Sequence, residues 1–138
     1  MSGWQGYVTA AESKTDGKSA KIVMWAAVCS KADNSIWAKS DSFKLETAEV
    51  QKLMGDRKRF CESGPSLGGA KCMLIKDKME TDRLMYFRSK APCGQSVHVA
   101  VKTTNKAVII MASNPGIQPA ELNKIIDEMQ EHLLKNDY

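Results

Sequence analysis

The hydrophobic pattern near the end of the chain changes from the period of a strand to the period of a helix. Val97, Val99 and Val101 alternate with their neighbours, which is typical of a strand with one buried face. The polar segment 103–106 then favours a turn, and the apolar segment 108–111 predicts a second strand. Two strands joined by so short a connection pair in antiparallel fashion.

An amphipathic helix follows this hairpin. Pro119 suits the first helical position, where its missing N–H costs no hydrogen bond. The apolar stripe of the helix consists of Leu122, Ile125, Ile126, Met129 and Leu133. Because this stripe and the apolar face of the hairpin must both be covered, the region predicts a helix packed on an antiparallel sheet.

The start of the chain also predicts a helix. Ser2 and Gln5 have the spacing of a capping box, in which each side chain accepts a hydrogen bond from the other residue's backbone N–H. Residues at helical spacing form one apolar face, namely Trp4, Tyr7, Val8 and Ala11. We expect this helix to end before Asp16 and Gly17.

The next segments predict two strands and a short helix. The continuous apolar run 22–28 is typical of a buried strand, and residues 36–38 begin another strand after the turn signal 33–35. Thr47 is expected to cap a short helix that ends at Gly55 in the left-handed conformation.

The middle of the chain predicts short strands. Segments 60–62, 72–75 and 84–87 are strand-like, and the glycines between 64 and 69 suit tight turns. The element order is therefore typical of an α+β domain, with a mainly antiparallel sheet and helices on its faces. No repeat or linker interrupts residues 1–138, so we expect a single domain.

Charge and hydropathy exclude several classes of protein. The net charge of +4 is only mildly basic, so it argues against a nucleic-acid-binding protein and suits acidic protein or lipid surfaces. No apolar run has the length of a membrane span or a signal peptide, and we expect a cytosolic protein. Cys29, Cys61, Cys72 and Cys93 are widely spaced, which predicts buried free thiols with no disulfide, metal or cofactor.

A catalytic constellation is not evident in the sequence. His98 and His132 do not stand in a known pattern with a serine, cysteine or acid, so we expect no enzymatic activity. The glycine-rich segment 64–72 resembles a phosphate-binding loop only superficially. Ala70 separates the last glycine from lysine, and Cys72 stands where a hydroxyl residue is needed.

Aromatic residues at the two ends of the chain indicate a binding site. Trp4 and Tyr7 lie one helical turn apart, Tyr138 is the last residue, and His132 lies at the edge of the last helix's core stripe. Core packing is the simpler explanation for the first pair. If the terminal helices lie side by side, however, all four residues converge on one surface. Such aromatic surfaces bind proline-rich segments, whose carbonyls accept hydrogen bonds from indole, phenol and imidazole donors.

Four segments in register resemble the profilin family over essentially the whole chain. They are residues 3–7, residues 35–38, residues 67–72, and the ending with His132, Leu133 and Tyr138. The resemblance implies a central antiparallel sheet with both terminal helices on one face and short helices on the other. It also implies a polyproline-binding groove made of Trp4, Tyr7, Trp37, His132, Leu133 and Tyr138.

The resemblance further implies a charged surface that binds monomeric actin. Its residues are Lys71, Met73, Ile75, Lys76, Arg88, Lys90, Ser96, His98, Ile117, Asn123, Lys124, Asp127 and Glu128. Family members regulate polymerisation by delivering monomers to barbed ends, and they bind formin-type proline-rich proteins and anionic phosphoinositide lipids. The resemblance therefore implies a monomeric protein of the cytoplasm and cytoskeleton.

Several positions depart from well-known family members. Lys76 often appears there as arginine and His98 as asparagine, and Asp127 replaces an aromatic residue. Since lysine lacks the bidentate fork of arginine, these changes bear on actin affinity. The alternative function is a polyproline-binding adaptor with weak or no actin binding. An enzyme or small-ligand protein on a similar scaffold is the alternative from another class.

Overall fold

The computed structural model describes residues 4–13, 21–41, 43–55, 66–67, 70–78, 83–90, 94–136 and 138. Its helices are α1 (Trp4–Glu12), α2 (Thr47–Leu53) and α4 (Pro119–Lys135). Its strands are β1 (Val23–Ser30), β2 (Ile36–Lys39), β3 (Ser66–Leu67), β4 (Ala70–Lys71), β5 (Met73–Lys78), β6 (Leu84–Lys90), β7 (Ser96–Thr103) and β8 (Ala107–Ser113).

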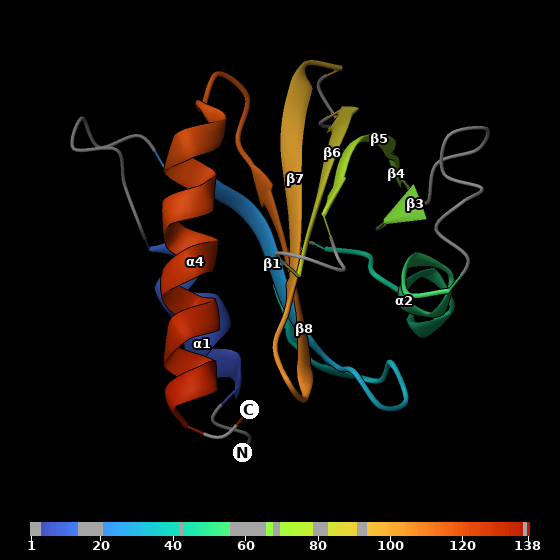
Figure 1. The fold of residues 1–138 in the computed structure, drawn as a ribbon. Coiled ribbons are helices and arrows are strands. Elements are labelled where there is room, and N and C mark those ends of the chain that lie inside the picture. Colours follow the sequence, from blue (N-terminus) through green and yellow to red (C-terminus); the bar gives the residue numbers. More distant parts are fainter. Residues whose placement is uncertain are drawn as a thin grey trace.

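Six strands form one antiparallel sheet in the order β2-β1-β8-β7-β6-β5, and β3 pairs with β4 beside it. Helices α1 and α4 lie side by side on one face, whereas α2 and the β3–β4 pair lie on the other (Figure 1). α1 packs on β1 and β2, and α4 packs on β7 and β8. The α+β architecture with both terminal helices on one face is therefore confirmed.

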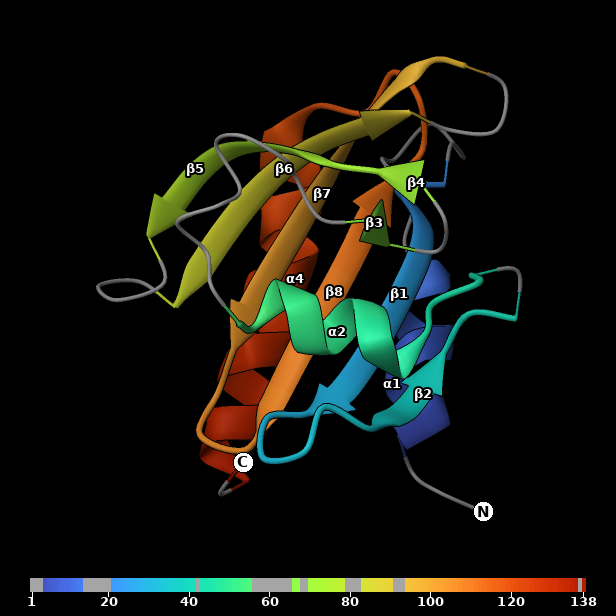
Figure 2. The same cartoon turned by 90° about the vertical axis from the view of Figure 1, so that its right-hand side faces the viewer.

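Each face of the sheet buries its own hydrophobic cluster, because alternate residues of a strand point to opposite faces. On β8, Ile109 and Met111 face the terminal helices, whereas Val108 and Ile110 face α2. Figure 2 shows α2 crossing this second face. The stripe of α4 predicted from its helical period is buried throughout, from Leu122 to Leu133.

The predicted N-cap of α2 and the predicted left-handed conformation of Gly55 are wrong, although the helix does end just before Gly55. The helix is capped by Glu46, whose N–H donates to the Glu49 carboxylate at 3.0 Å, and Thr47 is already helical. The last turn tightens instead of entering the left-handed region, because the Gly55 N–H donates to the Lys52 carbonyl at 3.2 Å. Met54 is the C-terminal cap, in the right-handed conformation.

Several predictions concern residues that the structure does not describe. Ser2 of the predicted capping box, the turn at 16–17, the strand at 60–62 and the glycines of the glycine-rich segment (Gly64, Gly68 and Gly69) are among them. Gln5, which the capping box would use, donates from its side-chain amide to the Lys39 carbonyl at 3.4 Å. Pro119 occupies the start of α4 as predicted.

Candidate functional site

Aromatic rings from four parts of the chain meet at one end of the face that carries the terminal helices. Trp4 of α1 stacks on Trp37 of β2, with ring centroids 4.6 Å apart and an interplanar angle of 30°. Tyr138 meets Trp4 edge-on at 4.8 Å, and Tyr7 lies 5.4 Å from both Trp4 and His132 of α4. We call Trp4, Tyr7, Trp37, His132 and Tyr138 the aromatic cluster. Four of its rings are half-buried, and His132 is exposed.

A β-bulge brings Trp37 into this cluster. Val28 of β1 lies opposite Ala38 and Cys29 lies opposite Ile36, so Trp37 has no partner of its own on β1. The extra residue of a bulge departs from strict alternation and re-aims its side chain. Trp37 and Ala38 therefore both pack on the hydrophobic cluster beneath α1, although they are neighbours in sequence.

Backbone contacts hold Tyr138 in place. Its N–H donates to the Leu133 carbonyl at 2.9 Å, and its own carbonyl accepts the Lys106 N–H from the β7–β8 turn at 2.5 Å. The Lys106 ammonium lies 5.7 Å from the centre of the Tyr138 ring. The Leu133 side chain is fully buried, so this predicted groove residue lies beneath the surface and contributes a carbonyl anchor.

The predicted actin residues of β5, β6 and β7 share one face of the sheet. Met73 lies opposite Arg88, which lies opposite His98, so the three form a row across the strands. Lys90 and Ser96 form the next row. Residues directly opposite in antiparallel strands point to the same face. This is the face of the terminal helices, because Tyr86, two residues before Arg88, reaches α4.

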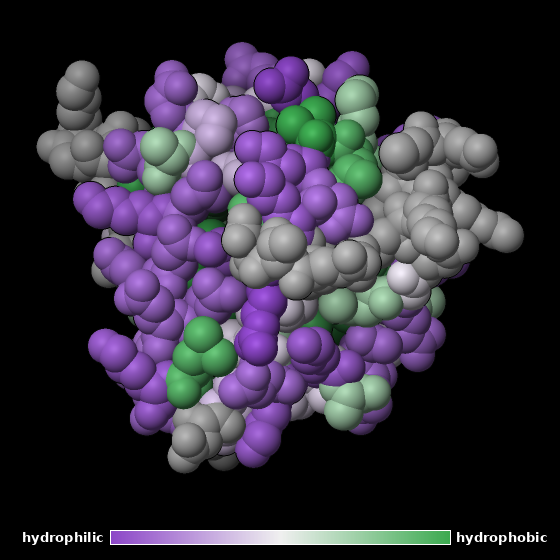
Figure 3. Space-filling model, viewed as in Figure 1, coloured by the Kyte–Doolittle hydropathy of each residue, from purple (hydrophilic) through white to green (hydrophobic). Residues whose placement is uncertain are grey.

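A bulge also shapes the outer strand. Leu74 pairs with Phe87 and Lys76 with Tyr86, which leaves Ile75 as the extra residue. Ile75 is 54% exposed and Met73 is 64% exposed. Figure 3 shows an apolar patch over the upper ends of β5 and β6 within a largely hydrophilic surface, and a second patch over the C-terminal part of α4. The cations of Lys76, Arg88 and Lys90 are exposed beside these apolar groups.

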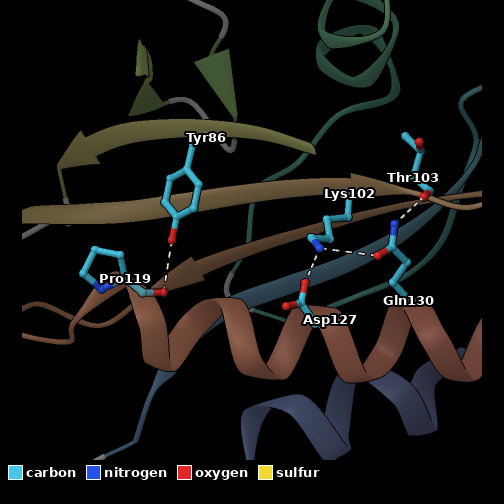
Figure 4. A network of polar contacts seen from close by, with 6 residues as sticks. All are labelled: Tyr86, Lys102, Thr103, Pro119, Asp127 and Gln130. Atoms are coloured by element: carbon cyan, nitrogen blue, oxygen red, sulfur yellow. Dashed lines mark hydrogen bonds and ion pairs between the residues drawn. The ribbon is translucent and has the colours of Figure 1, made fainter. Parts of the chain in front are cut away.

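A polar network ties α4 to the sheet beside this surface (Figure 4). The Tyr86 hydroxyl donates to the Pro119 carbonyl at 3.1 Å, and Lys102 forms an ion pair with Asp127. Burial raises the pKa of the Tyr86 phenol, a hydrogen bond with Asn123 lowers it, and the charge of Asp127 raises it further. Asn123 and Asp127 therefore lie against β6 and β7. Tyr86 and Lys102 were missed by the sequence analysis, because their partners are distant in sequence.

Further contacts place the remaining members of the predicted actin set. The Lys71 carbonyl accepts a hydrogen bond from the Ser89 hydroxyl at 2.8 Å, which joins β4 to β6. Ile117 is half-buried on the core beneath the helices, and its N–H donates to the Asn114 carbonyl at 3.3 Å. Gly116, between them, has φ +85°, which favours glycine in this turn.

Lys124 and Glu128 occupy an exposed part of α4. Glu128, with Tyr7 and His132, lines a groove of about 300 Å³ between α1 and α4. The two predicted surfaces therefore adjoin on α4, and Glu128 stands beside the aromatic cluster.

Other titratable groups are shifted by burial. Desolvation lowers the pKa of His98, and the neighbouring Arg88 charge lowers it further. Burial raises the pKa of the Cys29 thiol to about 12 and that of Cys72 to about 11. Both are buried thiols, as predicted, whereas Cys61 and Cys93 lie outside the described residues.

Metal-binding clusters and membrane-spanning helices are both absent from the described part of the chain. No group of three or more histidine, cysteine or acidic side chains is placed to hold a metal ion within the described ranges. Among the helices that the structure describes, none combines the length and apolar character needed to cross a bilayer.

Comparison with known proteins gives consistent matches along the chain. The family model for profilin matches residues 2–138. Profilin-1 of Mus musculus is 32% identical over 100% of this chain and 100% of its own length. Profilin-2 of Rattus norvegicus is 29% identical over 96% of this chain and 96% of its own length. Among solved structures, mouse profilin IIa in complex with a double repeat from the FH1 domain of mDia1 has a TM-score of 0.82 and 27% identity, covering 99% of this chain and 100% of that one. Rat profilin 2a has a TM-score of 0.83 and 28% identity, covering 99% of this chain and 97% of the other. The chain belongs to the profilin family.

Proposed function

We propose that this protein binds proline-rich segments at the aromatic cluster. The observation that carries this proposal is the convergence of Trp4, Tyr7, Trp37, His132 and Tyr138 on one surface from both ends of the chain and from β2. Flat rings pack on pyrrolidine rings, and indole, phenol and imidazole groups supply donors for the free carbonyls of a polyproline II helix. The complex of mouse profilin IIa with an FH1 repeat supports a formin-type partner.

We further propose that it binds monomeric actin and delivers monomers to barbed ends. Profilin family proteins are actin-binding regulators and not enzymes. The face formed by β5–β7 and the neighbouring side of α4 carries exposed Met73 and Ile75 beside Lys76, Arg88 and Lys90. An apolar centre with a charged rim is the usual anatomy of a protein interface, and the cations suit an acidic partner.

A second candidate is a polyproline-binding adaptor with weak or no actin affinity. It is favoured by Asp127, which forms an ion pair with Lys102 of the sheet and replaces an aromatic residue of familiar profilins. The Asp127 side chain is 49% exposed, so releasing it from Lys102 to contact actin costs roughly 0–1 kcal/mol. Calorimetry with actin monomers separates the candidates, because the adaptor shows weak or no actin binding while it still binds polyproline.

The remaining aspects of the proposal follow the family. We place the protein in the cytoplasm with the cytoskeleton, as a single monomeric domain that needs no metal or cofactor. Its exposed lysines and arginines also suit anionic phosphoinositide lipids. The direct test of the central proposal is passage over immobilised poly-L-proline. We expect retention at physiological salt and elution by free polyproline or denaturant, and full recovery in the flow-through contradicts the proposal.

A further inference from the structure

The groove between α1 and α4 continues from the aromatic cluster. Tyr7 and His132 belong to both, and their rings, with centroids 5.4 Å apart, stand at the boundary. The groove has a volume of about 300 Å³, which is enough for one or two side chains. A ligand chain that runs across the surface of these two rings therefore passes from the cluster to the groove.

The lining of the groove has a definite chemistry. Ala11 and Met129 are buried and apolar, and Ala10 is exposed at its edge. The small alanines of α1 leave room that a larger residue would fill. Glu128 contributes the only formally charged side chain among the lining residues.

We propose that this groove is a subsite for the residues flanking the proline run of the ligand. It takes an apolar side chain against Ala11 and Met129, and a basic side chain next to it lies near Glu128. A polyproline II helix offers the same rings and carbonyls along its length, so it carries little sequence information. Contacts to flanking residues therefore decide which proline-rich partner is preferred. The inference rests on the proposed polyproline binding.

The test compares peptides by calorimetry. The probes are a proline decamer and the decamer extended by Leu-Lys at its C-terminus or Lys-Leu at its N-terminus. Matched controls carry Gly-Ser in place of the pair, or glutamine in place of the lysine. We expect one Leu/Lys peptide to bind the wild-type protein about three- to tenfold more tightly than its Gly-Ser control, as partial burial of one aliphatic side chain predicts. The two placements of the flank allow for either direction of the ligand.

Two pairs of variants locate the gain. Ala10→Leu fills the edge of the groove with a good helix former and should abolish the gain, whereas Thr9→Leu, on an exposed α1 position about 100° away, should keep it. Glu128→Gln should remove the preference for Leu-Lys over Leu-Gln, of about twofold at low salt, and Glu131→Gln should not. Equal binding of the plain decamer by every variant shows that the cluster itself is intact.

The outcomes are distinguishable. If the plain decamer binds and no flank increases affinity, or if the gain survives in Ala10→Leu, the subsite is refuted while polyproline binding stands. If Ala10→Leu also loses the plain decamer, the Glu128→Gln pair decides alone, and an unchanged lysine preference refutes the subsite. If the wild-type protein binds none of the peptides, the proposed function fails and the subsite with it.

Discussion

Replacing Trp37 by alanine tests whether the aromatic cluster is the polyproline site. The substitution removes the stack on Trp4 at 4.6 Å and the edge contact with Tyr138 at 6.3 Å. Each aromatic pair contributes about 0.5–1.5 kcal/mol beyond area burial, so the free protein loses roughly 1–3 kcal/mol of cluster packing. The ligand also loses a large apolar anchor. We expect polyproline affinity to fall by about 2 kcal/mol or more, which is roughly thirtyfold.

Isothermal titration with a proline decamer measures this loss. Calorimetry is preferred to fluorescence because the substitution removes one of three tryptophans. Trp25→Ala is the matched control: Trp25 is also half-buried, but it stacks on Phe43 with centroids 5.1 Å apart, on the opposite face of the sheet. The control should lower the melting temperature and leave polyproline affinity within about twofold. A loss below threefold in a folded Trp37→Ala protein would refute the anchoring role.

Three further predictions concern the actin surface and the thiols. Arg88→Glu should weaken actin-monomer binding, and the loss of affinity should shrink as salt is added because exposed charges are screened. Polyproline affinity should change less than about twofold. Equal loss of both activities in a folded variant contradicts two separate sites. In an NMR titration, His98 should titrate below its ordinary pKa of 6.5, first because of desolvation and then because of Arg88. Since the pKa of His98 is lowered in the folded state, its contribution to stability is present above pH 6.5 and is lost as pH falls through the folded pKa. Arg88→Gln should raise the pKa of His98 partly towards 6.5. An unchanged pKa of His98 in that variant rejects the contribution of Arg88. Burial raises the pKa of the Cys29 thiol to about 12 and that of the Cys72 thiol to about 11. Both should therefore resist alkylation by iodoacetamide in the native protein near pH 8, which peptide mass spectrometry measures. Rapid alkylation of either thiol in the native protein contradicts this prediction.

Local sequence patterns predict most of the elements and the class of fold. Val97, Val99 and Val101 alternate on one strand, and the stripe from Leu122 to Leu133 has the helical period. These are local signals, because a strand or helix repeats its own geometry along the chain. The pairing of Trp4 with Tyr7 is local for the same reason. The ends of α2 were less predictable, since Glu46 could serve as well as Thr47 once Glu49 was placed to accept its N–H.

The way in which distant residues share a surface depends on tertiary contacts. Strict alternation would put Trp37 and Ala38 on opposite faces, and the bulge against β1 overrides it. Tyr138 is held by Lys106, far away in sequence, and α4 is placed on the sheet by the bond from Tyr86 to the backbone of Pro119. Strand register and bulges depend on pairing between segments that are far apart along the chain, so no local period encodes them. For that reason, the sequence could nominate the aromatic residues of the candidate site, while their assembly into one surface depended on the packing of the sheet and its two terminal helices.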